Sequence, residues 1–412
     1  MKKSYLMIAA AAALFAACAE NEIKNDVKDF GEYKIGFSTF TQKATRAENS
    51  AEGYSQALES HHGTFKVWGF KNTTADAVFE GDVVTHQTSP EGWTYTDTRY
   101  WDKAATDYYF YACAPSTGSF TFNGVSTDKA DATEVAASKA SQPNGYFTVG
   151  STTTYYDLAG DNVSPKNSTD KVEYWSTAAA THDDIDLMIA DVCHYNKTTS
   201  PTIATAITDK VQLHFIHILS RLNITLKYST AFGTSSATTG DIITVNNITV
   251  GHMKGAGAFN ENTNLGNVVL ANGTDLRWTK PATGTGSDVN YSYDIAYDVT
   301  DDANYVVEAL IIPQTANLET IALDGTEVTG DAETAPYLYI NYTIWNAGKS
   351  KGETFEAYYN LASVFGITGT DVLAFNEGWM NTLNIIIDPA SIVFDADVAT
   401  WDETENENLT IN

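Results

Sequence analysis

The sequence predicts an all-β protein built of β-sandwich domains, and three observations support this. Short segments that alternate or run apolar are separated by clusters of Gly, Asn, Asp, Ser and Thr, as in a sandwich. The 23 Tyr, 18 Phe and 8 Trp residues favour a pleated sheet, and charged residues make up only 18% of the chain. A chain of 412 residues is long enough for two such domains, each with its own core.

The first residues have the pattern of an export signal. Lys2 and Lys3 precede an apolar run over residues 6–17, which is too short to span a bilayer stably. We therefore expect residues 1–17 to be a signal peptide. Small residues before Cys18 predict lipidation of that thiol, with ordinary secretion as the alternative. The polar, acidic residues 18–30 would then tether the folded body to the lipid.

The remaining chain is predicted to form two sandwiches, residues 31–208 and 209–412. In the first, Tyr108–Ala114 is apolar on both faces and stops at Pro115, which is typical of a central strand. Between residues 210 and 227 the apolar positions change parity around residues 217–221. A bulge or short turn at that point would redirect the chain from one sandwich to the next.

The second half contains further strand patterns. A second parity change falls at Asn246-Asn247. Tyr337–Trp345 alternates clearly, with Leu338 and Ile340 on one face. The stretch 354–365 fits either a strand or a helix, and residues 55–60 and 131–141 are short helical candidates.

Charge and cysteine content limit the function classes. A net charge of -28 excludes nucleic-acid binding, because phosphate would be repelled. After Cys18, only Cys113 and Cys193 remain, and the sequence leaves open whether they pair.

Motifs for catalysis are lacking. No nucleophile elbow, phosphate loop or dinucleotide fingerprint is present, and the eight histidines have no spacing that gathers three metal ligands. We expect no enzymatic activity, no metal and no cofactor. Sugar stacking is the alternative to core packing for four tryptophans: Trp68, Trp93, Trp101 and Trp278.

Several segments in order resemble the fimbrillin family of type V pilins. The segment that carries most of the resemblance is residues 211–222, which looks like the strand between the two domains of that family. The other segments are residues 35–37 with 44–47, 65–70, 93–95 with 100–101, 109–115, 186–190, 311–314 and the closing run 379–401.

The resemblance implies two tandem transthyretin-like β-sandwich domains in an outer-membrane lipoprotein that polymerises into a cell-surface fimbrium. A maturation protease would cut after Arg46, and Ala47 would become the new N-terminus. The first strand, with Tyr33, Ile35 and Phe37 on one face, would leave, and a neighbouring subunit's strand would replace it. The implied partners are other pilin subunits, the protease, the membrane and a host or bacterial surface ligand.

The donor strand and the place in the fibre stay open. Val398, Trp401, Leu409 and Ile411 belong either to a donor strand or to the last strand of this subunit's own sheet. The tail is short for a stalk subunit, so a tip or accessory subunit is also considered. The alternative function is a monomeric, glycan-binding surface lipoprotein.

Overall fold

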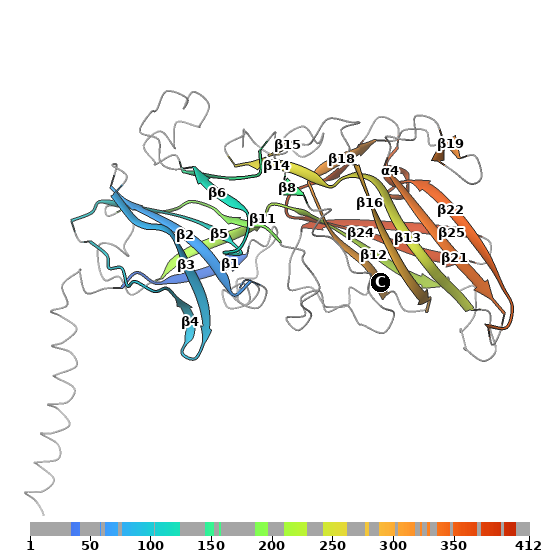
Figure 1. Ribbon diagram of the computed structural model, residues 1–412, viewed down its shortest axis with the longest axis horizontal. Coiled ribbons are helices and arrows are strands. Elements are labelled where there is room, and N and C mark those ends of the chain that lie inside the picture. The colour runs from blue at the N-terminus through green and yellow to red at the C-terminus, as the bar shows by residue number, and fades with distance from the viewer. Residues whose placement is uncertain are drawn as a thin grey trace, which may run out of the picture.

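The protein is described from a computed structural model. It describes residues 34–41, 58, 62–72, 76–102, 104–123, 145–151, 156–157, 186–196, 210–228, 242–261, 277–279, 288–300, 304–317, 322–323, 328–329, 336–346, 349–368, 372–388 and 391–400. These residues lie mostly in strands, so the prediction of an all-β fold is confirmed (Figure 1). Within these ranges no helix has the length and apolar character needed to cross a membrane.

The N-terminal half is organised around an eight-stranded sheet in the order β1-β11-β9-β5-β2-β3-β4, with β10 beside β5. Its strands are β1 (Phe37–Thr41), β2 (Thr64–Lys71), β3 (Asp76–Thr88), β4 (Glu91–Thr94), β5 (Asp107–Ala114), β9 (Met188–Ala190), β10 (Cys193–Asn196) and β11 (Val211–His217). The sheet curls so that its two ends, β1 and β4, contact each other. The curl encloses an aromatic core that includes Phe37, Phe65, Phe79 and Phe110.

A second sheet joins the two halves of the chain. It has five strands, ordered β15-β14-β7-β6 with β8 beside β14. Three of them come from the first half, β6 (Phe120–Asn123), β7 (Tyr146–Val149) and β8 (Tyr156–Asp157), and two from the second, β14 (Ala256–Asn260) and β15 (Trp278–Thr279). A core with Phe147, Phe259 and Trp278 connects this sheet to the outer face of the first.

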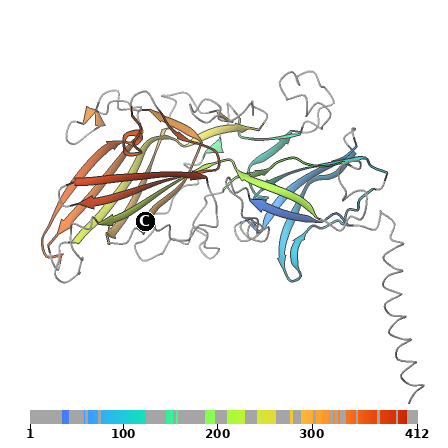
Figure 2. The ribbon, with the colours of Figure 1, turned by 180° about the vertical axis from the view of Figure 1, so that it is seen from behind.

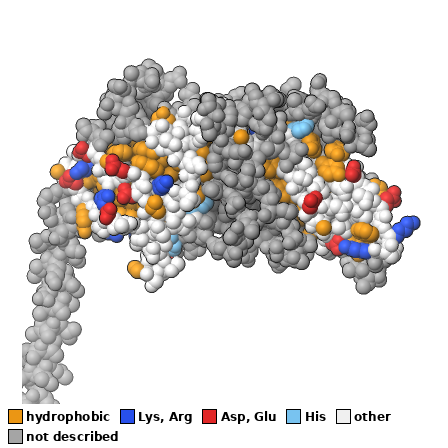
Figure 3. Space-filling view, viewed as in Figure 1, with side chains coloured by type: hydrophobic (Ala, Val, Ile, Leu, Met, Phe, Trp, Pro, Cys, Tyr) orange, Lys and Arg blue, Asp and Glu red, His pale blue; other side chains and the backbone are white. Residues whose placement is uncertain are grey.

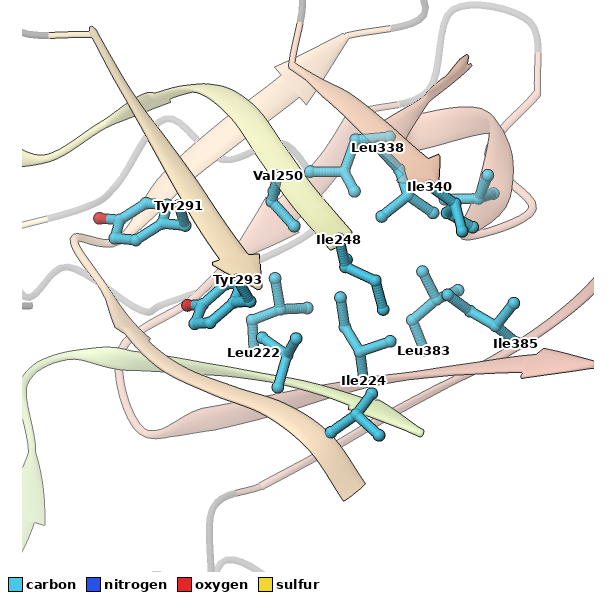
Figure 4. Close-up of a cluster of buried hydrophobic side chains, with 14 of the residues drawn as sticks. Leu222, Ile224, Ile248, Val250, Tyr291, Tyr293, Leu338, Ile340, Leu383 and Ile385 are labelled. Carbon is cyan, nitrogen blue, oxygen red and sulfur yellow. The ribbon is translucent and has the colours of Figure 1, made fainter. Parts of the chain in front are cut away.

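The C-terminal half is a sandwich of two four-stranded sheets. One has the order β17-β12-β24-β25 and the other β16-β13-β21-β22. Their bounds are β12 (Ser220–Tyr228), β13 (Ile242–Lys254), β16 (Asp288–Asp298), β17 (Asn304–Ile311), β21 (Tyr337–Trp345), β22 (Gly352–Asn360), β24 (Trp379–Asp388) and β25 (Ser391–Thr400). Figure 4 shows their inward side chains meeting, with Leu222 and Leu383 from one sheet and Ile248 and Ile340 from the other.

Small elements complete the second half. Two short pairs are β18 (Gln314–Asn317) with β23 (Val372–Phe375), and β19 (Ala322–Leu323) with β20 (Val328–Thr329). The ambiguous stretch 354–365 combines both predicted states, because β22 is followed at once by the one-turn helix α4 (Leu361–Val364). Asn360 caps this turn through its side chain, which accepts from the Ser363 amide.

The strand predictions hold where they are described. β5 is a buried strand between β2 and β9, as predicted for residues 108–114. The parity change near residues 217–221 marks the passage of the chain from β11 in the first sheet to β12 in the C-terminal sandwich. The change at Asn246-Asn247 is a register shift in β13 against both neighbours.

The division into domains at residues 208/209 stays a proposal. Because β11 pairs with β1 and β9 of the first sheet, the strand pairing favours a crossing point slightly later, at Ile218-Leu219.

The two helical candidates are not tested by the structure. Residues 131–141 lie outside the described residues, and of residues 55–60 only Leu58 is described.

The two described cysteines are free. Cys113 belongs to the core beneath the five-stranded sheet, whereas Cys193 packs on the aromatic core on the other side of the first sheet. The sheet itself therefore separates the two thiols. Burial raises the pKa of Cys113 to about 12 and that of Cys193 to about 11, which disfavours the reactive thiolate.

Candidate functional site

The candidate site is the place that the first strand occupies in the N-terminal half, here called the first-strand site. It comprises Ile35 to Thr41, the strand β11 on one side and residues 95–99 on the other. β1 is an edge strand and runs parallel to β11, with Phe37 opposite Val211 (Figure 2, where β1 is blue). An edge strand has only one strand neighbour, so its removal would leave the rest of the sheet connected.

The backbone before β1 is bound from both sides. On the β11 side, the Val211 amide donates to the Gly36 carbonyl at 2.7 Å. On the opposite side, the Ile35 amide donates to the Arg99 carbonyl at 2.9 Å. The Tyr95 hydroxyl donates to the Ile35 carbonyl at 2.5 Å. The segment therefore bridges β11 and residues 95–99, which are not paired with each other in the described part of the chain.

The inward side chains of the segment are fully buried. Ile35, Phe37 and Thr39 are each 0% exposed. The Phe37 ring makes edge contacts with four other rings, at centroid distances of 5.9 Å to Phe65, 5.4 Å to Phe79, 5.8 Å to Tyr95 and 6.1 Å to Phe110. Such contacts add to the stabilisation from burial alone. Phe37 thus lies at the centre of the aromatic core.

Charged groups hold the outer border of the site. The Lys34 ammonium lies 5.0 Å from the centroid of the Tyr95 ring. Arg99 donates from Nε to the Val78 carbonyl at 3.0 Å and lies 3.6 Å from the Asp82 carboxylate. Burial raises the pKa of Tyr95, so its hydroxyl keeps the proton that it donates to the Ile35 carbonyl.

This geometry suits binding of a β-strand rather than catalysis. The site offers main-chain donors and acceptors along β11, and pockets at alternate positions that now hold Ile35, Phe37 and Thr39. Thr39 has a buried Oγ1 without a hydrogen-bond partner among the described residues. A segment with a comparable apolar pattern could make the same contacts.

The sequence-predicted site residues are only partly described. Ile35 and Phe37 lie together in the first-strand site. Cys18, Tyr33, Arg46, Ala47, Trp401, Leu409 and Ile411 lie outside the described residues. Val398 belongs to β25, which is the edge strand of its sheet and is paired with β24.

Three of the four tryptophans considered for sugar stacking are core residues, and the fourth, Trp68, is partly buried and packs against the core. Trp93 is 7% exposed, Trp101 1% and Trp278 3%. Trp68 stacks on Phe122 at a centroid distance of 4.9 Å. Their default use in core packing is therefore confirmed.

Sequence reasoning missed a buried His–Asp–His cluster near the exit of β11. The Asp186 carboxylate lies 2.7 Å from His217 Nδ1 and 3.9 Å from His62 Nε2. Burial lowers the pKa of His62 to about 4. The three residues come from three distant parts of the chain, so no local spacing indicates them. Among the described residues, no group of three or more potential ligands is arranged to hold a metal ion.

Comparison with known proteins supplies the family. Solved structures that resemble the chain include a fimbrial protein from Bacteroides vulgatus, at 14% identity and a TM-score of 0.47 over 90% of this chain and 99% of that one. A putative cell adhesion protein from Bacteroides uniformis matches at 15% identity and a TM-score of 0.41, covering 90% and 99% of the two chains. The tip fimbrial protein Mfa3 from Porphyromonas gingivalis matches at 13% identity and a TM-score of 0.33, covering 84% and 96%.

These structural likenesses are low, and the assignment does not depend on them. No curated protein matches the sequence. The family model described as fimbrillin-like matches residues 45–371, which is most of the chain. The chain therefore belongs to the fimbrillin-like family.

Proposed function

We propose that this protein is a structural or adhesive subunit of a cell-surface fimbria. It is exported as a lipoprotein through Cys18, is cut by a protease after Arg46, and polymerises by exchange of its first strand for a strand of another subunit. Its two halves serve as tandem transthyretin-like domains. The family membership and the position of β1 support this proposal.

The observation that carries the proposal is the combination of edge position and complete burial in β1. A strand in the middle of the sheet could not leave without breaking two ladders, whereas β1 has one, and on its other side, among the described residues, only the bonds of Ile35 to Arg99 and Tyr95 and the bridge of Lys34 with Tyr100 would also break. Its side chains nevertheless fill the aromatic core. Loss of the strand would uncover a ready-made apolar site next to the unpaired edge of β11.

The free energies involved favour the binding of a new strand in that site. Exposure of Ile35 and Phe37 would cost roughly 1.5–3 kcal/mol for each side chain. The unpaired β11 edge adds further loss of ladder hydrogen bonds. An incoming strand restores both contributions, so the exchanged complex would be strongly favoured over an open subunit.

Cleavage by an Arg-specific protease tests the proposal. We expect the protease to release the segment up to Arg46 from the purified precursor and to yield oligomer ladders that resist boiling in detergent. The variants Arg46→Ala and Arg46→Lys should not be cut at position 46 and should stay monomeric, because neither offers an arginine there. Arg46→Lys keeps the charge and so isolates the protease's requirement.

Two results would contradict the proposal. One is release of the first strand without any oligomer, at concentrations where the precursor is soluble. The other is oligomer formation by uncut Arg46→Ala at the rate of the cleaved protein, which would show that strand removal is unnecessary.

A further inference from the structure

The outer face of the sheet β16-β13-β21-β22 carries an ordered row of side chains that strand exchange does not use. Along β21, Leu338 and Ile340 point into the core. The alternating residues Tyr337, Tyr339, Asn341, Thr343 and Trp345 therefore point outward. The row extends over about 27 Å, at roughly 3.4 Å for each residue.

Two aromatic rings of the row lie along the sheet, each across a glycine. Tyr337 is paired with Gly251 of β13, where a Cβ would come within 2.1 Å of the tyrosine Cζ. Trp345 is paired with Gly352 of β22, where a Cβ would come within 2.5 Å of the indole Cε3. These rings therefore cover neighbouring backbone, and His252 packs edge-to-face with Tyr337 at a centroid distance of 5.0 Å. Both Tyr337 and Trp345 are partly exposed.

Two further tyrosine rings, those of Tyr339 and Tyr358, lie next to Tyr337. Tyr358 of β22 lies opposite Tyr339, with the two ring centroids 4.6 Å apart. It also lies 6.0 Å from Tyr337. All three tyrosines are only partly buried. Together they form an aromatic platform at one end of the row, with Trp345 at the other.

Amides and hydroxyls fill the space between the two ends. Asn246 Nδ2 donates to Asn341 Oδ1 at 2.7 Å, and Asn341 Nδ2 donates to Glu356 Oε1 at 3.2 Å. Asn247 Nδ2 donates to Asp294 Oδ1 at 2.8 Å, on the exposed part of the same face. These groups are oriented by each other, because each asparagine amide nitrogen donates to two partners within the face. The remaining lone pairs of the amide and carboxylate oxygens can accept further hydrogen bonds from a ligand.

The charged groups on this face limit the charge that a ligand can carry. The exposed carboxylates are those of Glu356, Asp294 and Asp298. Lys349 is paired with Asp298, at 2.6 Å from Nζ to Oδ1. An anionic polymer would be repelled here. In Figure 3 the coloured, described part of the C-terminal half shows small hydrophobic patches on a mostly uncharged surface, with a few acidic and basic side chains.

We propose that this face binds a neutral polysaccharide. Sugar rings present an apolar C–H face that can stack on a flat aromatic ring, and hydroxyls that suit amides and carboxylates. A chain several sugar units long would stack on Tyr337, Tyr339 and Tyr358 at one end and on Trp345 at the other. An extended peptide, in contrast, would pair with the main chain of an edge strand, β16 or β22, and would not lie across the side chains of the row.

Native affinity electrophoresis of the purified full chain tests this site. The probes are yeast mannan, galactomannan and dextran dissolved in the gel, with heparin and polylysine as charged comparisons. We expect retardation by at least one neutral polysaccharide, and none by heparin. The double variant Tyr339→Ala/Tyr358→Ala should lower the apparent affinity at least tenfold, and Asn341→Ala should lower it by a smaller factor.

The matched control is Tyr100→Ala, which removes a tyrosine that is 50% exposed in the other half of the chain. It should bind as the unaltered protein does. Thermal unfolding confirms that each variant is folded, and the single variant Tyr358→Ala replaces the double variant if the latter is not. The proposal is overturned if no neutral polysaccharide retards the protein, if the Tyr339 and Tyr358 variants bind unchanged, or if polylysine alone binds at this face.

Discussion

At the scale of the residue, the first-strand site depends on partners far apart in the sequence. That Ile35 and Phe37 share one face follows from strand alternation, and the sequence predicted it. Their contacts with Tyr95 and Arg99 did not follow from any local pattern, because those residues lie about 60 positions away. Sequence alone therefore indicates which side chains turn inward, but not what receives them.

Phe37 gives the most direct test of burial in this site. We expect Phe37→Ala to lower the free energy of unfolding by about 3–5 kcal/mol, because it leaves a cavity among four aromatic rings. The measurement is urea unfolding of the uncut precursor. Ser38→Ala on the same strand, a partly buried position, should change the free energy by no more than about 0.5 kcal/mol. Equal effects at the two positions would show that β1 is not a core strand.

The lowered pKa of His62 predicts that the folded protein is less stable in acid. Its pKa in the folded state is about 4, below the ordinary value of 6.5, so unfolding takes up a proton between these two values. The contribution to stability is complete above pH 6.5, decreases as the pH falls through this window and is lost below about 4. Its full size is about 3 kcal/mol.

The variant His62→Gln isolates this contribution, because glutamine keeps a polar side chain that cannot become charged. Urea unfolding at neutral pH and at about pH 4.5 should show a smaller decrease for His62→Gln than for the unaltered protein. The same decrease in both would mean that His62 is not the titrating group.

At the scale of the element, the sequence was informative wherever periodicity alone decides the outcome. The parity change between β11 and β12 and the shift at Asn246-Asn247 both appear as expected, because a residue inserted in a strand exchanges its two faces. The stretch 354–365 was ambiguous since a strand and a helical turn follow one another without a break. The turn begins at the Asn360 cap, which is a local signal that periodicity does not include.

Gly69 tests how closely β2 packs with its neighbours. A Cβ at this position would lie 2.8 Å from Phe79 Cδ2 and 3.1 Å from Phe110 Cδ1, and both rings are buried. We expect Gly69→Ala to lower the free energy of unfolding by about 1–3 kcal/mol through overpacking. Gly36→Ala, whose Cβ would be 3.4 Å from Lys210 Cγ, should have little effect. Calorimetric or urea unfolding of both variants would separate them, and an unchanged Gly69→Ala would refute the tight packing.

At the scale of the whole molecule, the all-β class was predictable, and the joining sheet was not. Residues 116–184 are rich in turn-forming residues and show no strong core periodicity, yet β6, β7 and β8 from this stretch pair with one another or with β14 of the second half. These strands have two to four residues each. Strands so short carry almost no periodic signal, and the pairing of β7 and β8 with β14 spans about a hundred positions.

The joining sheet has a mechanical consequence. A tensile load that pulled the two halves apart would have to break the pairing of β14 with β7 and β8 and withdraw the Trp278 indole from the Ile218 carbonyl, to which it donates at 2.7 Å. When such hydrogen bonds lie side by side, they share the load and must break at the same time rather than one after another. The molecule should therefore behave under shear flow as one stiff rod, and any compliance of a filament would reside between its building blocks.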